Sequence, residues 1–588
     1  MTPERRPEQV FQGLGVSPGI AVGPAYLRIS GTVDVPSYAV AARDIAAEIA
    51  RLDDAVARAN RQIGKLRAKA RGMNGAAGEE LGLLLEAHAQ MLGDSRLLRG
   101  ARGRIERERI NAEAALEAEI GGIARAFAAM DDPYLAARLE DIRGVGTRLI
   151  RNLTRTPVKP FSAAPKGAII VADQITPADA AQMDPSRIVG CVAAQGGAEG
   201  HTAIMARALG LPTVLGIAGL MDHARVGASL IVDGDAGRVV LDPSPSTLAA
   251  YERRLEERHR EKRRLIRLRD LPAVTRDGTE IKLEANVELP IEMEGVRQAG
   301  ASGVGLLRTE FMFMNRADLP NEDEQARELI RVVAAMDGHP VTIRTLDIGA
   351  EKLAAALTDD IGAGAASALG LRGIRLSLKK SETLETQFRA ILRAAAHGPV
   401  RILLPMVTTP SEVRRAREIL GHAAHRLRRR RVAIPEALPP VGAMIEVPGA
   451  ALAADALAKT CDFFAIGSND LTMYTLAIDR ANEAVAHLFD PLHPAVLRLM
   501  QFSAEAGLRA GIPVSICGEI AGDPRFAALL VGFGSKELSM TATSIPRVKQ
   551  RIRAMDALAA RRRALLIMDQ TDSGRISMLL DDFNALQE

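Results

Sequence analysis

Chemically versatile side chains stand at the ends of short apolar runs throughout the second half of the chain. Arginines suit phosphate and carboxylate groups, because the guanidinium fork makes paired hydrogen bonds to both. Two carboxylates, Glu446 and Asp470, suit a magnesium ion that also binds phosphate oxygens. Together the set predicts a site for a small phosphorylated carboxylate, although a surface salt bridge explains each residue equally well when it is taken alone. The residues are Asn286, Arg308, Arg344, Glu446, Asn469, Asp470, Cys517 and Glu519.

A second candidate is the histidine of GGAEGHTAIMARALGLPTVLG, residues 196–216. Gly196, Gly197 and Gly200 free the backbone just before a predicted helix, and His201 stands at its first turn. Exposed amides and the helix dipole stabilise anions at such a place. A neutral imidazole there can attack phosphorus, and the same amides stabilise the phosphorylated product. A lone histidine is more often structural, but this position favours a catalytic one.

The elements that would position the first group form a regular series from about residue 271 to the end. Short apolar strands alternate with loops and helices, and eight such strands argue for a (β/α)8 barrel. In barrels of this kind the active site lies at the C-terminal ends of the strands, which is where the candidate residues stand. The predicted strands are 282–287, 303–308, 341–347, 401–407, 441–446, 462–467, 514–519 and 537–540.

The first half of the chain changes composition twice. Residues 13–27 predict one or two strands, 44–152 about four amphipathic helices packed as hairpins, and 157–243 strands again. If the N-terminal strands complete the later sheet, the helical block is an insertion. Glutamates alternate with the basic residues of 248–270. This pattern favours a solvent-exposed linker helix over a basic helix face that binds nucleic acid or a membrane. The predicted domains are 1–30 with 157–247, the insertion 31–156, the linker helix 248–270 and the barrel 271–588.

Composition limits the classes of protein that fit. The 588 residues are 47% hydrophobic and 25% charged, which excludes global disorder and allows roughly four compact units. A net charge of +4 and few aromatic residues speak against a nucleic-acid partner. Three distant cysteines indicate neither disulfides nor a zinc site. The sequence shows no signal peptide and no apolar run of membrane-spanning length, so we expect a cytoplasmic protein.

Several long motifs closely resemble Enzyme I of the phosphotransferase system, the phosphoenolpyruvate–protein phosphotransferases. The resemblance runs from SPGIAVG at 17–23 to SIPRVK at 544–549, nearly the whole chain. Its barrel motifs are shared in part with pyruvate phosphate dikinase and phosphoenolpyruvate synthase. Besides the His201 segment, the motifs are GVGLLRTEFMFMNRADLPNEDEQ (303–325), IRTLDIGAEK (343–352), DFFAIGSNDLTMYTLAIDRANE (462–483) and CGEIAGDP (517–524).

The resemblance implies a multi-domain α/β protein. A swivelling phosphohistidine β/α domain with an inserted α-helical bundle would be followed by a C-terminal TIM barrel that binds phosphoenolpyruvate. The helical bundle would dock the phosphocarrier protein HPr or a nitrogen-type relative, and the barrel would form a homodimer. No nucleic acid and no membrane enters this scheme.

The resemblance also assigns roles to the residues. His201 would become phosphohistidine, and Cys517 would protonate the enolate as pyruvate forms. Phosphoenolpyruvate would be bound by Arg308, Arg344, Asn469, Asp470 and Arg480, and Mg²⁺ by Glu446 and Asp470.

This chain departs from the family pattern near several of these residues, which leaves its rate and carrier choice open. An acid two residues from His201 would repel phosphate unless it points away. Because the family's Asn-Pro before A-L-G-L-R is replaced here, Arg372 is left out of the predicted site. The departures are Glu199 and Gly200 beside the histidine, Ala180 for a threonine, Ala366-Ser367 for Asn-Pro, Met473 for glutamine, and Gly349-Ala350 for Gly-Gly.

Two other functions fit the sequence less well than the phosphotransferase. A dikinase or synthase needs a large additional ATP-binding domain, and the sequence before the His201 segment has no glycine-rich phosphate loop. A non-catalytic regulator that only binds the carrier would be expected to have lost at least one of His201, Glu446, Asp470 and Cys517, and all four are present.

Overall fold

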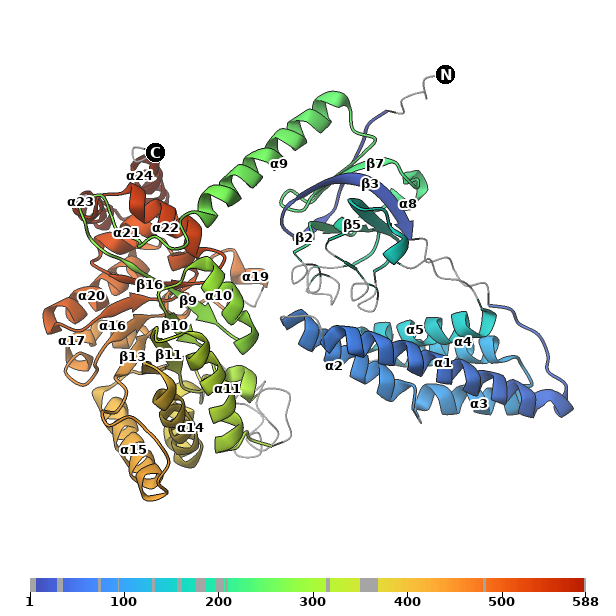
Figure 1. Cartoon of the computed structure of the whole chain (residues 1–588), viewed down its shortest axis with the longest axis horizontal. Coiled ribbons are helices and arrows are strands. Elements are labelled where there is room, and N and C mark those ends of the chain that lie inside the picture. Colours follow the sequence, from blue (N-terminus) through green and yellow to red (C-terminus); the bar gives the residue numbers. More distant parts are fainter. Residues whose placement is uncertain are drawn as a thin grey trace. The chain divides into compact units, whose positions relative to one another are not determined.

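The structure is a computed structural model that folds into two compact units, Met1–Arg260 and Glu261–Glu588 (Figure 1). The division falls inside the predicted linker helix, while the finer domain boundaries stay predictions. Among the described residues, no helix is both long and apolar enough to cross a membrane. The described residues are 7–28, 35–71, 76–93, 95–128, 133–155, 161–175, 179, 183–184, 186–196, 203, 206, 210–313, 318–348, 368–479 and 483–585.

The first unit contains an eight-stranded sheet in the order β1-β8-β7-β3-β4-β5-β6-β2. Strand β3 pairs with β7 on one side and β4 on the other, which confirms that the N-terminal strands complete the later sheet. Strand β6 was not predicted, because three residues between a proline and a glycine are too short to show a strand period. The strands are β1 (Gln9–Gln12), β2 (Leu14–Ser17), β3 (Ile20–Arg28), β4 (Ala168–Ala172), β5 (Ile188–Ala193), β6 (Thr213–Leu215), β7 (Ser229–Asp233) and β8 (Arg238–Leu241).

Strands β1 and β2 lie at opposite edges of this sheet, although only Gly13 separates them in the chain. The segment that connects β1 to β2 contacts the turn between β7 and β8, where the backbone N–H of Gly13 donates to the carbonyl oxygen of Gly237 at 2.8 Å. A Cβ atom on Gly15 would lie 2.1 Å from the carbonyl oxygen of Gly234, so only glycine allows this approach. The predicted hairpin turn at 233–237 is confirmed by the antiparallel pairing of Asp233 with Arg238.

Between β3 and β4 the described residues form five α-helices, where the sequence predicted four or so. Apolar side chains of these helices, such as Leu52 and Leu149, share one buried cluster with Ile170 and Cys191 of the sheet. Helix α9 (Pro245–Ile266) corresponds to the predicted linker helix, and its Arg254 pairs with Asp233 of the hairpin at 2.8 Å. The inserted helices are α1 (Ile45–Arg71), α2 (Ala76–Met91), α3 (Arg96–Glu108), α4 (Ala112–Ala128) and α5 (Pro133–Thr154), and the short α8 (Leu220–His223) follows β6.

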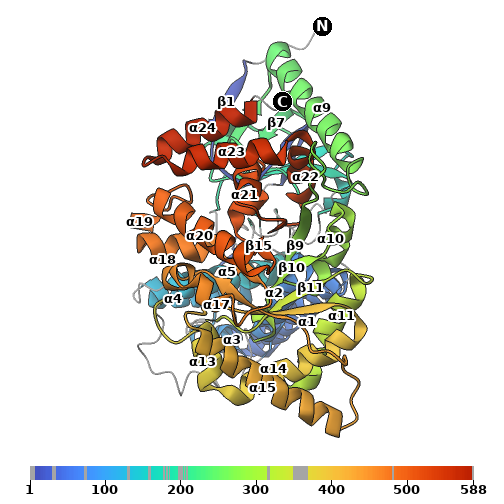
Figure 2. The same cartoon turned by 90° about the vertical axis from the view of Figure 1, so that its left-hand side faces the viewer.

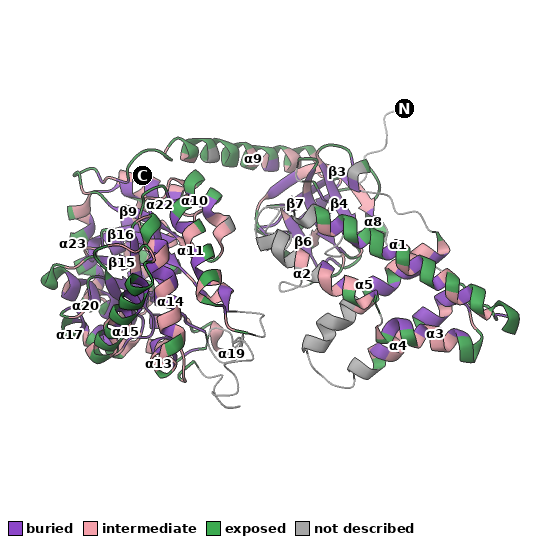
Figure 3. Cartoon of the chain, turned by 60° about the horizontal axis from the view of Figure 1, so that its bottom comes forward, coloured by how far each residue is buried: buried purple, intermediate pink, exposed green. Residues whose placement is uncertain are grey.

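The second unit is a closed barrel of eight parallel strands, which confirms the predicted (β/α)8 fold (Figure 2). Each predicted strand overlaps an observed one. Figure 3 shows the barrel strands buried and the outward faces of the surrounding helices exposed. The strands are β9 (Lys282–Val287), β10 (Val304–Leu307), β11 (Val341–Arg344), β12 (Val400–Leu404), β13 (Val441–Ile445), β14 (Phe464–Ile466), β15 (Val514–Ile516) and β16 (Glu537–Met540).

Helices surround the barrel and follow its strands along the chain. Helix α14 packs against α11 and α15, and α20 packs against α16, α17 and α23. The helices are α10 (Met293–Ala299), α11 (Glu322–Ala335), α13 (Gly373–Lys379), α14 (Ser381–Ala394), α15 (Pro410–Arg429), α16 (Pro448–Leu452), α17 (Ala454–Leu457), α18 (Ser468–Leu476), α19 (Glu483–Ala486), α20 (Pro494–Ala510), α21 (Ala527–Gly532), α22 (Ile545–Ala554), α23 (Ala557–Met568) and α24 (Ser573–Ala585).

The N-terminal end of the barrel is closed by buried charges. Arg401 donates to Glu284 at 3.0 Å and to Glu537 at 2.8 Å, and its guanidinium lies 5.2 Å from the ring centre of Phe463. Burial raises the pKa of Glu284 to about 7 even though Arg401 opposes the rise. In barrels of this kind the N-terminal end serves stability, and the active site lies at the C-terminal end.

Candidate active site at the barrel mouth

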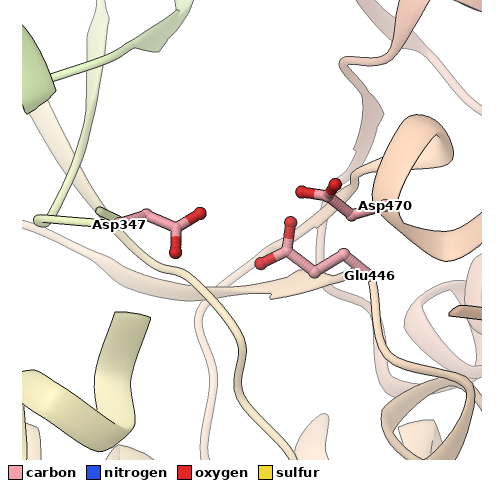
Figure 4. A group of neighbouring side chains, drawn as sticks. All are labelled: Asp347, Glu446 and Asp470. Atoms are coloured by element: carbon pink, nitrogen blue, oxygen red, sulfur yellow. The ribbon is translucent and has the colours of Figure 1, made fainter. Parts of the chain in front are cut away.

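Three carboxylates come together at the C-terminal ends of the barrel strands. Asp347 follows β11, Glu446 follows β13, and Asp470 lies in the first turn of α18. One oxygen from each lies within 4.8 Å of the others, and the three groups face a common space (Figure 4). Glu446 and Asp470 were predicted as metal ligands, whereas Asp347 was missed. The signal that could have found it was its place at the end of the predicted strand 341–347.

Glu446 is the most buried of the three, with 1% of its surface exposed. It accepts a hydrogen bond from the backbone N–H of Met406 at 2.6 Å. Burial and the neighbouring carboxylates of Asp347 and Asp470 raise its pKa well above the ordinary value, and Arg344 only partly opposes them. Buried carboxylates this close together repel one another unless a proton or a cation offsets their charge. Carboxylate oxygens are hard ligands, so the group fits a hard divalent cation such as Mg²⁺.

Arg344 is buried beside this group and makes two ion pairs. It lies 3.0 Å from Glu310 and 3.3 Å from Asp347. Burial opposes its charge, but these carboxylates, Glu310 foremost, raise its guanidinium pKa above the ordinary value. Among the described residues, Nε of Arg344 and Oε2 of Glu310 are buried without a hydrogen-bond partner. Buried polar atoms in native proteins are normally paired, so the mouth has hydrogen-bonding capacity left for a ligand.

Arg372 lies beside Asp347 even though it was left out of the predicted site. Its Nε and Nη2 donate to the two carboxylate oxygens of Asp347 at 3.1 and 3.0 Å. Burial opposes its charge, but Asp347 raises its pKa above the ordinary value. Its Nη1 approaches the hydroxyl of Tyr474 at 3.5 Å, and that hydroxyl donates to the carbonyl of Ala368 at 2.6 Å. The arginine was excluded because residues before it depart from the family pattern, and the structure shows that it belongs to the mouth.

Arg308 and Asn469 lie at the ends of two other strands. Arg308 follows β10, keeps 40% of its side chain exposed and pairs with Glu288. Asn469, after β14, donates to Glu519 at 3.0 Å, and its Oδ1 accepts from the backbone N–H of Glu519 at 3.1 Å. These two bonds fix the orientation of the amide. Arg308 and Asn469 therefore both lie at the C-terminal end of the barrel, each held by a neighbouring glutamate.

Cys517 follows β15 and is buried, with 4% of its surface exposed. Burial, and then the carboxylate of Glu446, raises the pKa of its thiol to about 12. The thiol donates to the carbonyl oxygen of Ile466 at 3.5 Å. It is therefore protonated at neutral pH, as a proton donor must be, and is a poor nucleophile.

We expect iodoacetamide to alkylate Cys517 very slowly in the native protein at pH 8. A thiol with a pKa of about 12 is almost entirely protonated at pH 8, so it has far less of the reactive thiolate than an ordinary thiol. The rate should rise as the pH rises toward 11. Peptide mapping by mass spectrometry separates Cys517 from Cys191 and Cys461, and the urea-unfolded chain is the reactive control. Rapid labelling of native Cys517 at pH 8 would contradict the burial and its effect on the pKa.

Two predicted site residues, His201 and Arg480, lie outside the described residues. The same holds for the departures at Ala180, Glu199, Gly200, Gly349-Ala350 and Ala366-Ser367. Their roles stay predictions. The described residues bring Asp347, Glu446 and Asp470 together with Arg344 and Arg372, and they place Arg308, Asn469 and Cys517 at the ends of other strands of the same barrel.

Comparison with known proteins gives matches over nearly the whole chain. Family models of the PEP-utilising enzymes match the N-terminal domain at residues 12–138, the mobile domain at 164–237 and the PEP-binding domain at 262–557. A phosphoenolpyruvate-protein phosphotransferase of Cupriavidus necator is 44% identical over 92% of this chain and 94% of its own length. One from Geobacillus stearothermophilus is 39% identical over 92% of each chain.

A solution structure of an Enzyme I protein covers 42% of this chain and 99% of its own, with 30% identity and a TM-score of 0.38. The fold and the matched domains are those of an enzyme that uses phosphoenolpyruvate. The chain belongs to the family of phosphoenolpyruvate-protein phosphotransferases, which confirms the resemblance seen in the sequence.

Proposed function

We propose that this enzyme transfers the phosphoryl group of phosphoenolpyruvate to its own His201 and then to a histidine of an HPr-type phosphocarrier protein, releasing pyruvate. This is the first step of the phosphotransferase system, and we place it in the cytoplasm. The observation that carries the proposal is the acidic group Asp347, Glu446 and Asp470, which lies beside Arg344 at the mouth of a barrel matched by the PEP-binding model.

The residues of the mouth suit the two ends of phosphoenolpyruvate. Arg308, Arg344 and Arg480 would bind its phosphate and carboxylate, with the amide of Asn469 beside them. Glu446 and Asp470, joined by Asp347, would hold Mg²⁺, which when bound neutralises phosphate charge. Phosphoryl transfer depends mainly on positioning and charge neutralisation, and this arrangement of charges supports both.

The transfer itself moves one phosphoryl group and one proton. The bond between phosphorus and the enol oxygen breaks as a bond from phosphorus to a nitrogen of His201 forms. The enolate that leaves takes a proton at its methylene carbon from the thiol of Cys517, which gives pyruvate. The resulting thiolate recovers a proton from water. A thiol with a raised pKa is a proton donor at neutral pH and returns to its protonated form readily.

The second transfer needs a surface for the carrier protein. We assign it to the inserted helices α1–α5, which lie in the same unit as the chain segment that carries His201. The donor and the carrier cannot occupy one place, so the two half-reactions require the His201 domain to move between them. An assay that offers both a sugar-type and a nitrogen-type carrier would show which of the two this enzyme phosphorylates.

The proposal is tested by incubating the whole protein with phosphoenolpyruvate labelled in its phosphate, in the presence of Mg²⁺ and without ATP. The expected product is an acid-labile, base-stable label on the protein that passes to added HPr-type carrier, with one pyruvate formed for each label. No label on the folded, metal-loaded protein would overturn the enzymatic proposal and favour a carrier-binding regulator. A label that appears only with ATP would favour a dikinase or synthase.

We further propose that two copies of the chain associate through the barrel. Helices α20 and α23 contact each other, and both carry large apolar side chains on the surface. Phe502 is 45% exposed and Leu565 is 57% exposed. Exposed apolar side chains gathered on neighbouring elements are typical of an interface between proteins.

We expect the whole chain to be dimeric in light scattering at micromolar concentration. The double substitution of Phe502→Glu and Leu565→Glu should weaken the dimer about a hundredfold or more, because it places four charges in a desolvated contact. Val226→Glu is the matched control, since Val226 is 71% exposed in the other unit. A monomeric parent, or a double variant that dimerises as tightly as the parent, would contradict this interface.

A further inference from the structure

The backbone of Cys517 is held from two sides of the barrel. On one side, its N–H donates to the carbonyl oxygen of Ile466 at 3.0 Å, and its thiol donates to the same oxygen at 3.5 Å. On the other side, the side-chain amide of Asn286 donates to the carbonyl oxygen of Cys517 at 3.1 Å. Ile466 ends β14 and Asn286 lies in β9, so residues of two different strands hold the peptide groups on either side of the Cys517 Cα.

The carbonyl of Cys517 needs a partner from a side chain. The pairing of β15 with β16 ends at Ile516 opposite Leu538, one residue before Cys517. A buried backbone carbonyl that lies beyond the last paired residue of a strand lowers the stability of the fold unless another group donates a hydrogen bond to it. Asn286 supplies that donor by reaching past β16, which lies between β15 and β9 in the barrel.

A second residue fixes which way the Asn286 amide points. The hydroxyl of Ser539, in β16, donates to Oδ1 of Asn286 at 2.6 Å and is fully buried. With its oxygen occupied in this way, the amide presents its NH₂ group to Cys517. A Cβ atom on Gly305 would lie 2.5 Å from the Ser539 hydroxyl oxygen, so the glycine leaves the space in which Ser539 stands.

We propose that Asn286 and Ser539 are positioning residues for Cys517, which aim its thiol at the carbon to be protonated. The inference rests on the proposed function, in which Cys517 is the proton donor. A rotation of the Cys517 peptide would carry the thiol with it, and a displacement of about 1 Å at a reacting group can cost about a hundredfold in rate. Supporting hydrogen bonds of this kind typically hold reacting groups in place.

The test compares Asn286→Leu and Ser539→Ala with the parent and with Asn584→Ala. Leucine keeps most of the volume of asparagine but donates no hydrogen bond. Asn584, in the outer helix α24 of the same unit, is the matched control. Its side-chain amide also donates to a backbone carbonyl, that of Arg525, at 3.0 Å. The readouts are kcat and KM for phosphoenolpyruvate and the configuration of the methyl group of pyruvate made from substrate labelled stereospecifically with deuterium and tritium at its methylene carbon.

We expect Asn286→Leu and Ser539→Ala to lose about tenfold to a hundredfold in kcat with an unchanged KM. Both should also give pyruvate whose methyl group has a lower configurational excess than that made by the parent. The control variant should match the parent in both. An Asn286→Leu enzyme that keeps the parent's kcat and configuration would overturn the inference, and Ser539→Ala decides the matter if the leucine variant does not fold. The Cys517→Ser variant tests the proton donor of the proposed function directly. If it keeps the parent's configuration, the proton donor of the proposed function is wrong, whatever Asn286 does.

Discussion

Replacing His201 by alanine is expected to abolish labelling of the protein by phosphoenolpyruvate. Removal of a nucleophile that forms a covalent intermediate costs about 10⁴-fold or more, because the bond from its nitrogen to phosphorus can no longer form. The prediction comes from the sequence, in which glycines precede His201 and free backbone amides at a predicted helix start. The measurement is base-stable, acid-labile label per chain after rapid mixing with phosphoenolpyruvate and Mg²⁺.

A matched control exists in the same unit. His223 ends α8, is exposed, and makes a local contact through Nδ1 with the carbonyl of Gly219 at 2.9 Å. His223→Ala should label like the parent. If His201→Ala keeps its label, another residue carries the phosphoryl group. A Glu199→Ser variant that labels faster than the parent would show that the acid two residues from His201 restrains this enzyme, as the sequence departure suggests.

Replacing Glu446 by glutamine is expected to remove phosphoryl transfer almost as completely, by about a thousandfold. Glutamine keeps the shape of the side chain, and its oxygen can still accept the backbone N–H of Met406. What is lost is one of three carboxylates whose oxygens converge at the barrel mouth. The variant should therefore fold but bind Mg²⁺ weakly, and its labelling should require a much higher Mg²⁺ concentration.

Thermal unfolding separates this loss from a loss of structure. Burial and its neighbours raise the pKa of Glu446, so its ionised form costs stability as the pH rises through that raised pKa. Without metal, Glu446→Gln should therefore be at least as stable as the parent above that pH, while Mg²⁺ should raise the unfolding temperature of the parent alone. Asp455→Asn, at an exposed ion pair with Arg509, is the control and should behave like the parent. Full activity of Glu446→Gln at ordinary Mg²⁺ would exclude Glu446 as a ligand.

The barrel could be predicted because each of its strands has a strong local signature. A strand that is buried on both faces appears as a short apolar run, and the helix after it has a different period, so eight alternations point to one architecture. Strand ends were less certain: the run 341–347 was predicted as one strand, but β11 ends at Arg344. In the first unit, β6 was too short to show a pattern, and the described part of the inserted block forms five helices where about four were expected.

Sequence reasoning reached most of the candidate site but not all of it. Glu446 and Asp470 were found because each follows an apolar run that ends at the barrel mouth. Asp347 was missed because it is the last residue of the predicted strand 341–347, whereas β11 ends at Arg344 and leaves Asp347 in the loop after it. Arg372 was set aside for a departure at its neighbours, and only its paired hydrogen bonds to Asp347 showed its place.

The sequence by itself determined the class of fold, the family and the types of residue at the barrel mouth, since all three depend on local patterns and on motifs continuous in the chain. Only the tertiary structure decided which of these residues act together. Asp347, Glu446 and Asp470 are separated by up to 123 positions (470 − 347) in the chain, yet their oxygens lie within 4.8 Å of one another. Asn286 reaches Cys517 across 231 positions. Closure of the barrel brings strand ends together whatever their distance in sequence, and burial there sets the pKa of Glu446 and Cys517, which no local pattern can show.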